Sequence, residues 1–235
     1  MRLDIYITNK FKLQSRNKAS ELIKASKVVV DGTIIKKPSF FIEDSMNIEI
    51  LEEDFYVSRS AYKLKYFLED NTISVKDSIA LDIGSSTGGF TQILLNNDVA
   101  SVTCVDVGTN QLHTTIKNND KIVIVENTDI RKFHSKSTYN LITCDVSFIS
   151  IHNILDDINR LGSDKIIILY KPQFEVGREI TRDKNGVVLD KNAIQTQRTY
   201  FLEATQKLGW KLLIANESKL AGKSGNIEEL FYFIK

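Results

Sequence analysis

The chain has 235 residues, of which 42% are hydrophobic and 26% charged, and its formal net charge is +1. This is the composition of a globular protein that buries a sizeable core. No apolar stretch approaches the ~20 residues needed to cross a bilayer, no signal peptide precedes the basic N-terminus, and two cysteines support neither a disulfide framework nor a zinc site. We therefore expect a cytoplasmic protein.

Charge is unevenly distributed along the chain. Residues 1–37 hold nine Lys or Arg and three acids, an excess of six positive charges that leaves −5 for the remainder. The N-terminal segment is therefore the part expected to attract a negatively charged partner.

Residues 1–52 are predicted to form a small α/β domain. Ser15 is a favourable N-cap for a helix over 17–25. Asp31-Gly32, between the apolar runs 28–30 and 33–35, predicts a hairpin with a type I′ turn. The Ser-Arg helix start and the Val-x-Val-x-Gly hairpin resemble the small RNA-binding domain named after ribosomal protein S-four. A basic helix that is merely solvated is the alternative.

That resemblance implies that the basic side chains of the first domain contact RNA phosphates. The predicted RNA-binding residues are Arg2, Lys10, Lys12, Arg16, Lys18, Lys24, Lys36 and Lys37. Residues 53–57 form a short charged and aromatic joint, so residues 58–235 are expected to be a second domain that meets the first closely.

The second domain begins with a helix over 58–67 that places Lys63 among apolar side chains, where a lysine is usually a surface residue. A buried strand over 79–83 follows and runs into a glycine-rich turn. The turn has neither the G-x-G-x-x-G spacing of dinucleotide sites nor the lysine of a phosphate loop.

An acid two residues before such a turn resembles the S-adenosylmethionine site of Rossmann-like methyltransferases, although a plain strand-turn-helix is the alternative. The cofactor-binding residues that this resemblance implies in and after the turn are Asp82, Gly84, Ser85, Ser86, Thr87, Gly88, Gly89, Phe90, Asp106, Asp129 and Asp145.

From residue 79 onwards, strands and helices alternate, which predicts an α/β domain with a mostly parallel, Rossmann-like sheet, helices on both faces and an antiparallel last strand. Asp106, Asp129 and Asp145 each follow a strand, so all three should face one crevice at the carboxyl ends of the strands. The strands are predicted over 79–83, 101–105, 121–126, 139–144, 165–170, 211–215 and 229–234, with helices over 90–97 and 191–208.

The fifth strand delivers Lys171, and Pro172 keeps that lysine extended, so its side chain should project from the end of the strand. A polar loop over 176–190 follows, and loops of that length tend to be functional or disordered. His113, His134 and His152 are scattered, which favours ordinary surface or capping roles.

Lys63, Asp145, Lys171 and Glu228, in this order, are similar to the catalytic tetrad of ribose 2′-O-methyltransferases of the FtsJ type. With the SSTGGF turn, CDVSF, KPQFEVG and GNIE, the chain resembles the TlyA family of rRNA cytidine 2′-O-methyltransferases. The resemblance implies S-adenosylmethionine as cofactor and Lys171 as the residue that takes or polarises the hydroxyl proton. Glu229 is adjacent to Glu228, and the choice between them depends on the family motif.

The chain begins at MRLDIYI and stops after LFYFIK, which resembles the shorter TlyA type that acts on the large-subunit rRNA. We expect a monomer that contacts ribosomal RNA or a ribosomal subunit and requires neither a metal nor a membrane. Two alternatives are a haemolysin-like membrane-acting protein, which would need an amphipathic or spanning segment, and a catalytically inactive RNA-binding protein, which would need a broken tetrad.

Overall fold

The computed structural model describes residues 1–11, 13, 15–43, 45–51 and 56–235, and it divides into two compact units, Met1–Phe55 and Tyr56–Lys235. The predicted RNA-binding residue Lys12 and positions 53–55 of the predicted joint lie outside the described residues. Tyr56 and Val57 are buried, and the Val57 N–H donates a hydrogen bond of 2.8 Å to Gln92 in the second unit. The domain boundaries at 52 and 58 remain predictions.

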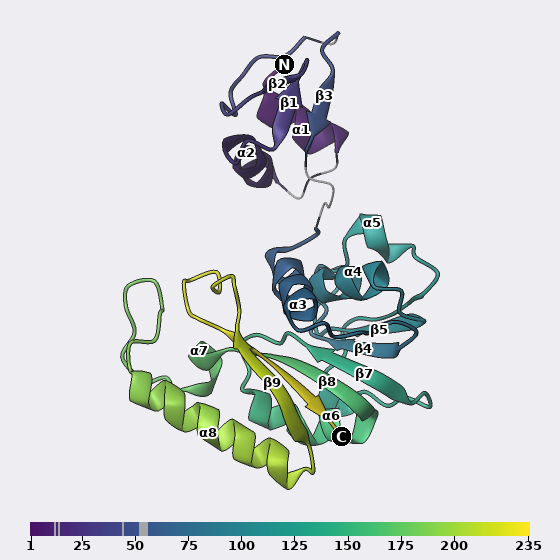
Figure 1. The fold of residues 1–235 in the computed structure, drawn as a ribbon, viewed down its shortest axis with the longest axis vertical. Helices are drawn as coiled ribbons and strands as arrows, with labels where there is room; N and C mark the ends of the chain where they lie inside the picture. Colours follow the sequence, from purple (N-terminus) through teal and green to yellow (C-terminus); the bar gives the residue numbers. More distant parts are fainter. Residues whose placement is uncertain (12, 14, 44, 52–55) are drawn as a thin grey trace. The chain divides into compact units, whose positions relative to one another are not determined.

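The N-terminal unit combines two helices with a three-stranded antiparallel sheet in the order β2-β1-β3 (Figure 1). Ser15 caps α2 by accepting a hydrogen bond from the Lys18 N–H, as predicted. Asp31 and Gly32 have φ angles of 47° and 77°, which confirms the tight hairpin turn. The elements are α1 (Leu3–Lys10), α2 (Arg16–Lys24), β1 (Val28–Val30), β2 (Thr33–Ile34) and β3 (Ile48–Ile50).

Asp4 joins the two helices of this unit. Its buried carboxylate contacts the guanidinium groups of Arg2 and Arg16, each at 2.9 Å. The hydrogen bond from Arg2, with a further contribution from Arg16, holds the pKa of Asp4 well below its usual range. Arg2 and Arg16 therefore have a structural role besides the RNA contacts predicted for them.

The second unit contains a seven-stranded sheet in the order β6-β5-β4-β7-β8-β10-β9, and β10 is the one antiparallel strand of this sheet within the described residues. This confirms the predicted fold class. The strands are β4 (Ile79–Ile83), β5 (Ser101–Val105), β6 (Ile122–Val125), β7 (Tyr139–Cys144), β8 (Gly162–Tyr170), β9 (Lys211–Glu217) and β10 (Glu229–Ile234).

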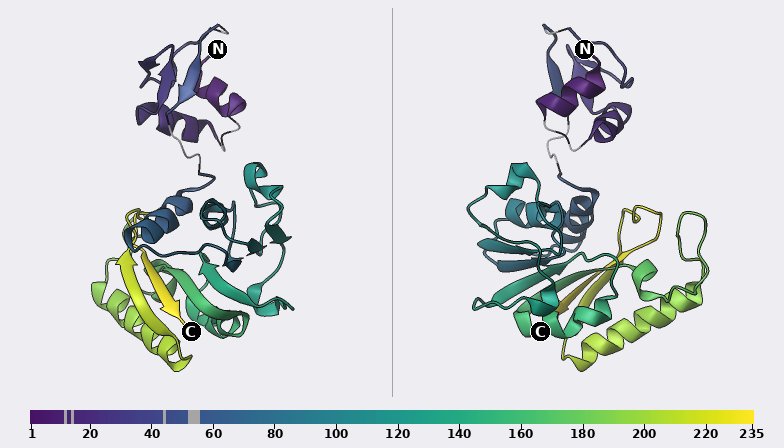
Figure 2. Two further views of the ribbon diagram at one scale, coloured as in Figure 1. Left: turned by 45° about the vertical axis from the view of Figure 1, so that its right-hand side comes forward. Right: turned by 180° about the vertical axis from the view of Figure 1, so that it is seen from behind.

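Helices cover both faces of this sheet (Figures 1 and 2). On β4, Leu81 and Ile83 join the apolar core that includes Phe201 of α8, whereas Asp82 points to the opposite face and contacts Thr91 of α4. The helices and 3-10 turns are α3 (Arg59–Asp70), α4 (Gly89–Asn96), α5 (Thr114–Lys117), η1 (Ile130–Lys132), η2 (Ile151–Ile154), α6 (Leu155–Leu161), α7 (Pro172–Glu175) and α8 (Lys191–Lys207). The carboxyl ends of β4, β5 and β7 contribute residues to a cavity.

Candidate active site

A cavity of about 470 Å³ lies at the carboxyl ends of β4, β5 and β7. At its base is Gly84, where φ is +74° and an added Cβ would lie 3.0 Å from the Asp145 carbonyl oxygen. Glycine is therefore required there both for the turn and for the close approach of two backbones. Five predicted cofactor residues line the cavity: Gly84, Ser86, Asp106, Asp129 and Asp145.

The remaining predicted cofactor residues do not line this cavity, and the structure gives several of them other neighbours. An added Cβ at Gly88, whose φ is +90°, would collide with Ile116 at 2.2 Å. At Gly89 it would collide with the Ser58 hydroxyl at 2.1 Å. These two glycines therefore allow close packing around the turn. The cavity lining leaves out Asp82, Ser85, Thr87, Gly88, Gly89 and Phe90.

Asp82 is completely buried on β4 and does not line the cavity. Its carboxylate accepts hydrogen bonds from Thr91 Oγ1 at 2.6 Å and from Thr143 Oγ1 at 2.8 Å. Complete burial raises the pKa of Asp82 to about 6, although the two threonine hydroxyls oppose that rise. In this structure Asp82 joins β4, β7 and α4 under the glycine turn.

Asp106 and Asp129 face the cavity from neighbouring strand ends, as the sequence predicted. The Asp106 carboxylate accepts hydrogen bonds from the backbone N–H groups of Ser86, at 2.8 Å, and Gly108, at 2.7 Å. Asp106 thus fixes the glycine turn against the next loop. Asp129 is paired with Arg131, whose hydrogen bonds lower the pKa of that carboxyl to about 2.

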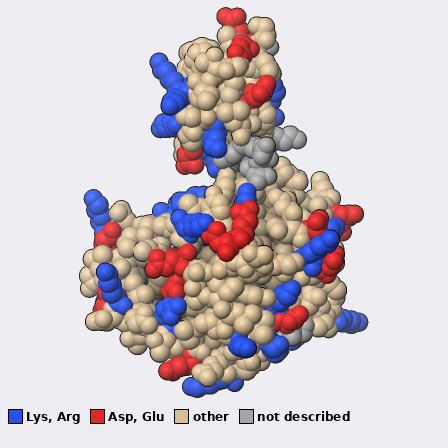
Figure 3. All heavy atoms as spheres, in the orientation of Figure 1, with Lys and Arg blue, Asp and Glu red and all other residues tan. Residues whose placement is uncertain are grey.

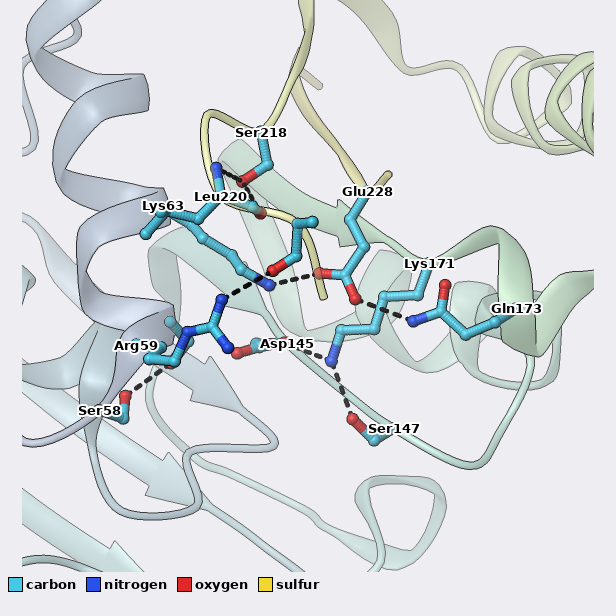
Figure 4. Close-up of polar contacts among 12 residues, drawn as sticks. Ser58, Arg59, Lys63, Asp145, Ser147, Lys171, Gln173, Ser218, Leu220 and Glu228 are labelled. Atoms are coloured by element: carbon cyan, nitrogen blue, oxygen red, sulfur yellow. Dashed lines mark hydrogen bonds and ion pairs between the residues drawn. The ribbon is translucent and has the colours of Figure 1, made fainter. Parts of the chain in front are cut away.

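A buried ion pair joins Lys63 of α3 to Glu228, the residue before β10 (Figure 4). The Lys63 Nζ lies 2.5 Å from Glu228 Oε2, and the Gln173 amide nitrogen donates to Glu228 Oε1 at 2.8 Å. Lys63 is 7% exposed and Glu228 is 3% exposed, so Lys63 is not a surface lysine. Glu229 instead pairs with Arg198 at 2.8 Å, which leaves Glu228 as the acid beside Lys63.

The second pair of the predicted tetrad joins Lys171 and Asp145. The Lys171 Nζ lies 2.6 Å from Asp145 Oδ1 and donates a hydrogen bond of 2.8 Å to the Ser147 hydroxyl. The backbone of Lys171 is extended, with φ −122° and ψ 96°, as Pro172 requires. Burial raises the pKa of Asp145, and the neighbouring Lys171 counters part of that rise.

The two pairs are close enough to interact, because Lys63 and Glu228 both act electrostatically on Asp145, which belongs to the cavity lining as well as to the pair with Lys171. Apart from its ion pair with Lys171, the buried Asp145 Oδ1 has no hydrogen-bond partner among the described residues, so it retains acceptor capacity. The structure therefore brings together Lys63 of α3, Asp145 and Lys171, which directly follow β7 and β8, and Glu228, which directly precedes β10, as Figure 4 shows.

Sequence reasoning missed several neighbours of this site. Gln173 donates a hydrogen bond to Glu228, and Ser147 accepts one from Lys171. Gln173 and Ser147 both lie in the motifs used for the prediction, but the prediction considered only the charged residues of those motifs. Phe148, the residue after Ser147, is 91% exposed and has a φ of 67°, which is unusual for a bulky residue. Its ring packs against Phe174 with a centroid distance of 5.3 Å. The sequence signal available for this ring contact was the phenylalanine in each of the motifs CDVSF and KPQFEVG.

Neither a metal centre nor a membrane span is found in the described part of the chain. Among these residues, no group of three or more His, Cys, Asp or Glu is placed to hold a metal ion. None of the described helices combines the length and apolarity needed to cross a bilayer.

Comparison with known proteins assigns a family to each unit. Residues 56–235 match the FtsJ-like methyltransferase family, and residues 1–48 match the S4 domain.

Relatives match this chain over nearly its whole length. A Campylobacter jejuni protein named 23S rRNA (cytidine-2′-O)-methyltransferase TlyA is 45% identical over all of both chains. A Mycobacterium tuberculosis protein named 16S/23S rRNA (cytidine-2′-O)-methyltransferase TlyA is 35% identical over 99% of this chain and 88% of its own. A solved structure from Streptococcus thermophilus, named as a hemolysin, superposes with a TM-score of 0.74 at 32% identity and covers 100% of this chain and 88% of that one.

Proposed function

We propose that this chain transfers a methyl group from S-adenosylmethionine to the ribose 2′-hydroxyl of a cytidine in ribosomal RNA. The proposal starts from its family, since the chain belongs to the TlyA proteins of the FtsJ-like methyltransferase family. The observation that carries the proposal is the presence of two buried ion pairs, Lys63 with Glu228 and Lys171 with Asp145, of which Asp145 lines the cavity. Four charged side chains rarely occupy such positions unless function requires them, because burial of charge is costly.

The cavity fits the proposed cofactor. Its lining combines apolar walls with carboxylates at the ends of neighbouring strands, where nucleoside ligands bind in folds of this type. Asp106 would face the ribose and Asp129 the adenine edge, while the Gly84 turn would lie beside the amino-acid end. When bound, S-adenosylmethionine supplies an activated methyl group on a sulfonium sulfur.

The chemistry requires alignment and proton removal. A 2′-hydroxyl is a weak nucleophile at neutral pH, and its oxygen must approach the methyl carbon from the side opposite the sulfur. Lys171 would take the hydroxyl proton or polarise the O–H bond, with Asp145 and Ser147 holding its Nζ in place. The new oxygen–carbon bond then forms as the carbon–sulfur bond breaks.

Lys63 and Glu228 would position the acceptor ribose. Their contact is buried, and Gln173 fixes the second oxygen of Glu228, so the carboxylate cannot rotate freely. A preorganised polar group of this kind stabilises a developing charge without reorganising during the reaction.

The N-terminal unit would supply most of the affinity for RNA. Within it, residues 1–37 carry nine Lys or Arg against three acids, and Lys10, Lys24, Lys36 and Lys37 are exposed. In Figure 3, basic side chains gather along one flank of this unit. Such cations bind phosphates with little sequence preference, so we assign the choice of nucleotide to the second unit.

The large-subunit rRNA is the substrate we favour, because 23S rRNA is common to the names of the Campylobacter and Mycobacterium relatives. Action on ribosomal RNA would also be consistent with the predicted cytoplasmic location. One chain provides all four tetrad residues, which is consistent with a monomer.

The decisive experiment maps 2′-O-methylation in rRNA from cells with and without this gene. We expect one cytidine of 23S rRNA to lose its methyl group in the deletion strain and to regain it when purified protein and S-adenosylmethionine are added to the isolated subunit. A liposome-leakage assay on the same protein tests the membrane-acting alternative. Identical methylation maps from the two strains would refute the proposed activity.

A further inference from the structure

Glu126 lies directly after β6 and is not part of the cavity lining. Its carboxylate accepts hydrogen bonds from three successive backbone N–H groups, those of Asn110 at 2.6 Å, Gln111 at 2.7 Å and Leu112 at 3.3 Å. Successive N–H groups that converge in this way form an anion-binding concavity. Here the anion is a side chain of the protein itself.

The loop that Glu126 binds forms one wall of the cavity. Val107, Gly108 and Gln111 all line it. The loop also folds tightly, because the space beside the Gly108 Cα is filled by Gln111, whose Cγ would lie 2.7 Å from an added Cβ. A displacement of residues 110–112 would therefore move the wall at 108 as well.

The same segment contacts the glycine turn beyond the cavity. The His113 N–H donates to the Thr87 carbonyl at 3.2 Å, and the side chains of Leu112 and Ile116 occupy the space beside Gly88. Asp106 meanwhile holds both Ser86 and Gly108. The loop over 107–112 is thus bound to the glycine turn at one side and to Glu126 at the other.

The Glu126 contact is well suited to hold a loop at the surface. Partial desolvation disfavours the charged carboxylate, but the three backbone hydrogen bonds, the first from Asn110, outweigh this and lower the pKa of Glu126. The carboxylate is consequently ionised at neutral pH, and hydrogen bonds to a charged acceptor are stronger than those to a neutral one.

We propose that Glu126 is a positioning residue for cofactor binding, because it fixes the loop over 107–112 as a preformed wall beside the predicted adenosine end of the site. This inference rests on the proposed function. A wall that is already ordered reduces the entropy lost when a ligand binds, so Glu126 raises affinity for the cofactor without contacting it.

The test compares the Glu126→Gln and Glu126→Ala variants with the wild type, all as full-length proteins. Binding is measured by isothermal calorimetry with S-adenosylhomocysteine and with methylthioadenosine, which lacks the amino-acid end. For both ligands the variants should have dissociation constants at least about tenfold larger than the wild type, a loss of about 1.4 kcal/mol in binding free energy. In methyl-transfer assays the KM for S-adenosylmethionine should rise while kcat at saturating cofactor stays within about twofold. Asp120→Asn, an exposed acid just before the same strand, is the matched control and should change neither quantity.

Two results would overturn the inference. One is unchanged affinity for both nucleoside ligands in both Glu126 variants. The other is weaker binding accompanied by a loss of unfolding free energy in the ligand-free protein that is as large as the loss of binding free energy, which would indicate a general structural role. The Gln variant keeps one acceptor oxygen, so it separates this case from failure to fold. If the wild-type protein itself bound neither ligand, the proposed function would fail instead.

Discussion

Lys63 and Glu228 are 165 residues apart in the chain, yet Lys63 Nζ lies 2.5 Å from Glu228 Oε2 in a buried contact. The pair connects α3, which precedes the sheet in the chain, to the residue directly before the last strand, β10. Loss of either partner leaves an uncompensated buried charge, whereas retention of both keeps the two elements in a fixed relation. The predicted catalytic arrangement therefore depends on the contact between these two elements.

Glu228→Gln and Glu229→Gln form a matched pair of neighbouring substitutions. We expect Glu228→Gln to lower kcat by about 10²-fold, the lower end of the range for groups that manage protons or charge in a transition state, because Glu228 contacts Lys63 and Gln173. Glu229→Gln removes the contact with Arg198 instead and should lower stability more than turnover. Steady-state kinetics and thermal unfolding of both variants check this. Equal losses of kcat would contradict the choice of Glu228.

Lys36 and Lys37 test the proposed division of labour between the units. Replacing both exposed lysines with glutamine should weaken binding to 23S rRNA and lower the salt dependence of log K by about 0.7 to 0.9 for each phosphate that is no longer neutralised. Calorimetric affinity for the cofactor should not change. The control is the double substitution Lys207→Gln and Lys211→Gln at exposed positions of the second unit. An equal loss of RNA affinity in the control would remove the special role of the N-terminal unit.

The sequence predicted the sheet well because its strands carry strong local signals. The runs over 139–144 and 229–234 are apolar and bounded by turns, and the structure has strands over those same residues. Helix α1 was not predicted, since only Leu3, Asp4 and Ile7 on its surface are buried and the apolar stripe is short. Long, strongly periodic segments are predictable, and short elements fixed by tertiary contacts are not.

The charged members of the candidate site were predictable from motifs, but their supporting contacts were not. Gln173 and Glu126 act through hydrogen bonds to residues 55 and 14 to 16 positions away, and no local pattern marks such partners. For Gly88 the motif predicts a ligand contact, which stays a prediction, and the structure places Ile116 in the space beside its Cα. A glycine motif signals close approach without revealing what approaches.

Asp82 makes the stability of the protein depend on pH. Burial raises its pKa to about 6 in the folded state, above the ordinary value of about 3.9. Its contribution to stability is therefore fully present below about pH 3.9 and is lost as pH rises through about 6. Relative to Asp82→Asn, the unfolding free energy of the wild type should fall by about 1.4 kcal/mol between pH 5 and pH 7.5, since each pH unit between the two pKa values is worth about 1.36 kcal/mol.

Urea unfolding of the two proteins across this pH range measures that difference. Comparison with the variant cancels the other titrating groups to a first approximation, because their surroundings are the same. The prediction fails if the difference in unfolding free energy between the wild type and Asp82→Asn stays constant with pH, or if it grows in favour of the wild type as pH rises. Either result would show that Asp82 is already ionised in the folded state at pH 5.

Lys171→Ala is the most direct test of the chemical step. The Lys171 amine contacts Asp145 and Ser147 but does not belong to the cavity lining. Its loss should therefore abolish methyl transfer, by about 10³-fold or more in kcat, while affinity for S-adenosylmethionine changes less than about threefold. A loss confined to kcat identifies an interaction made in the transition state. Lys207→Ala, at an exposed position near the end of α8, is the control for removing a positive charge.

The identity of the product completes this test, because the same lysine would have no role in methylation of a base. Methylation of pyrimidine carbon five requires a cysteine nucleophile that attacks the ring. Cys144 is completely buried and burial raises its thiol pKa to about 12, while Cys104 is equally buried. We therefore expect the methylated cytidine to resist alkaline cleavage at its 3′ side, since that cleavage needs a free 2′-hydroxyl. An alkali-labile product, or near-normal turnover by Lys171→Ala, would require a different acceptor atom or a different proton acceptor.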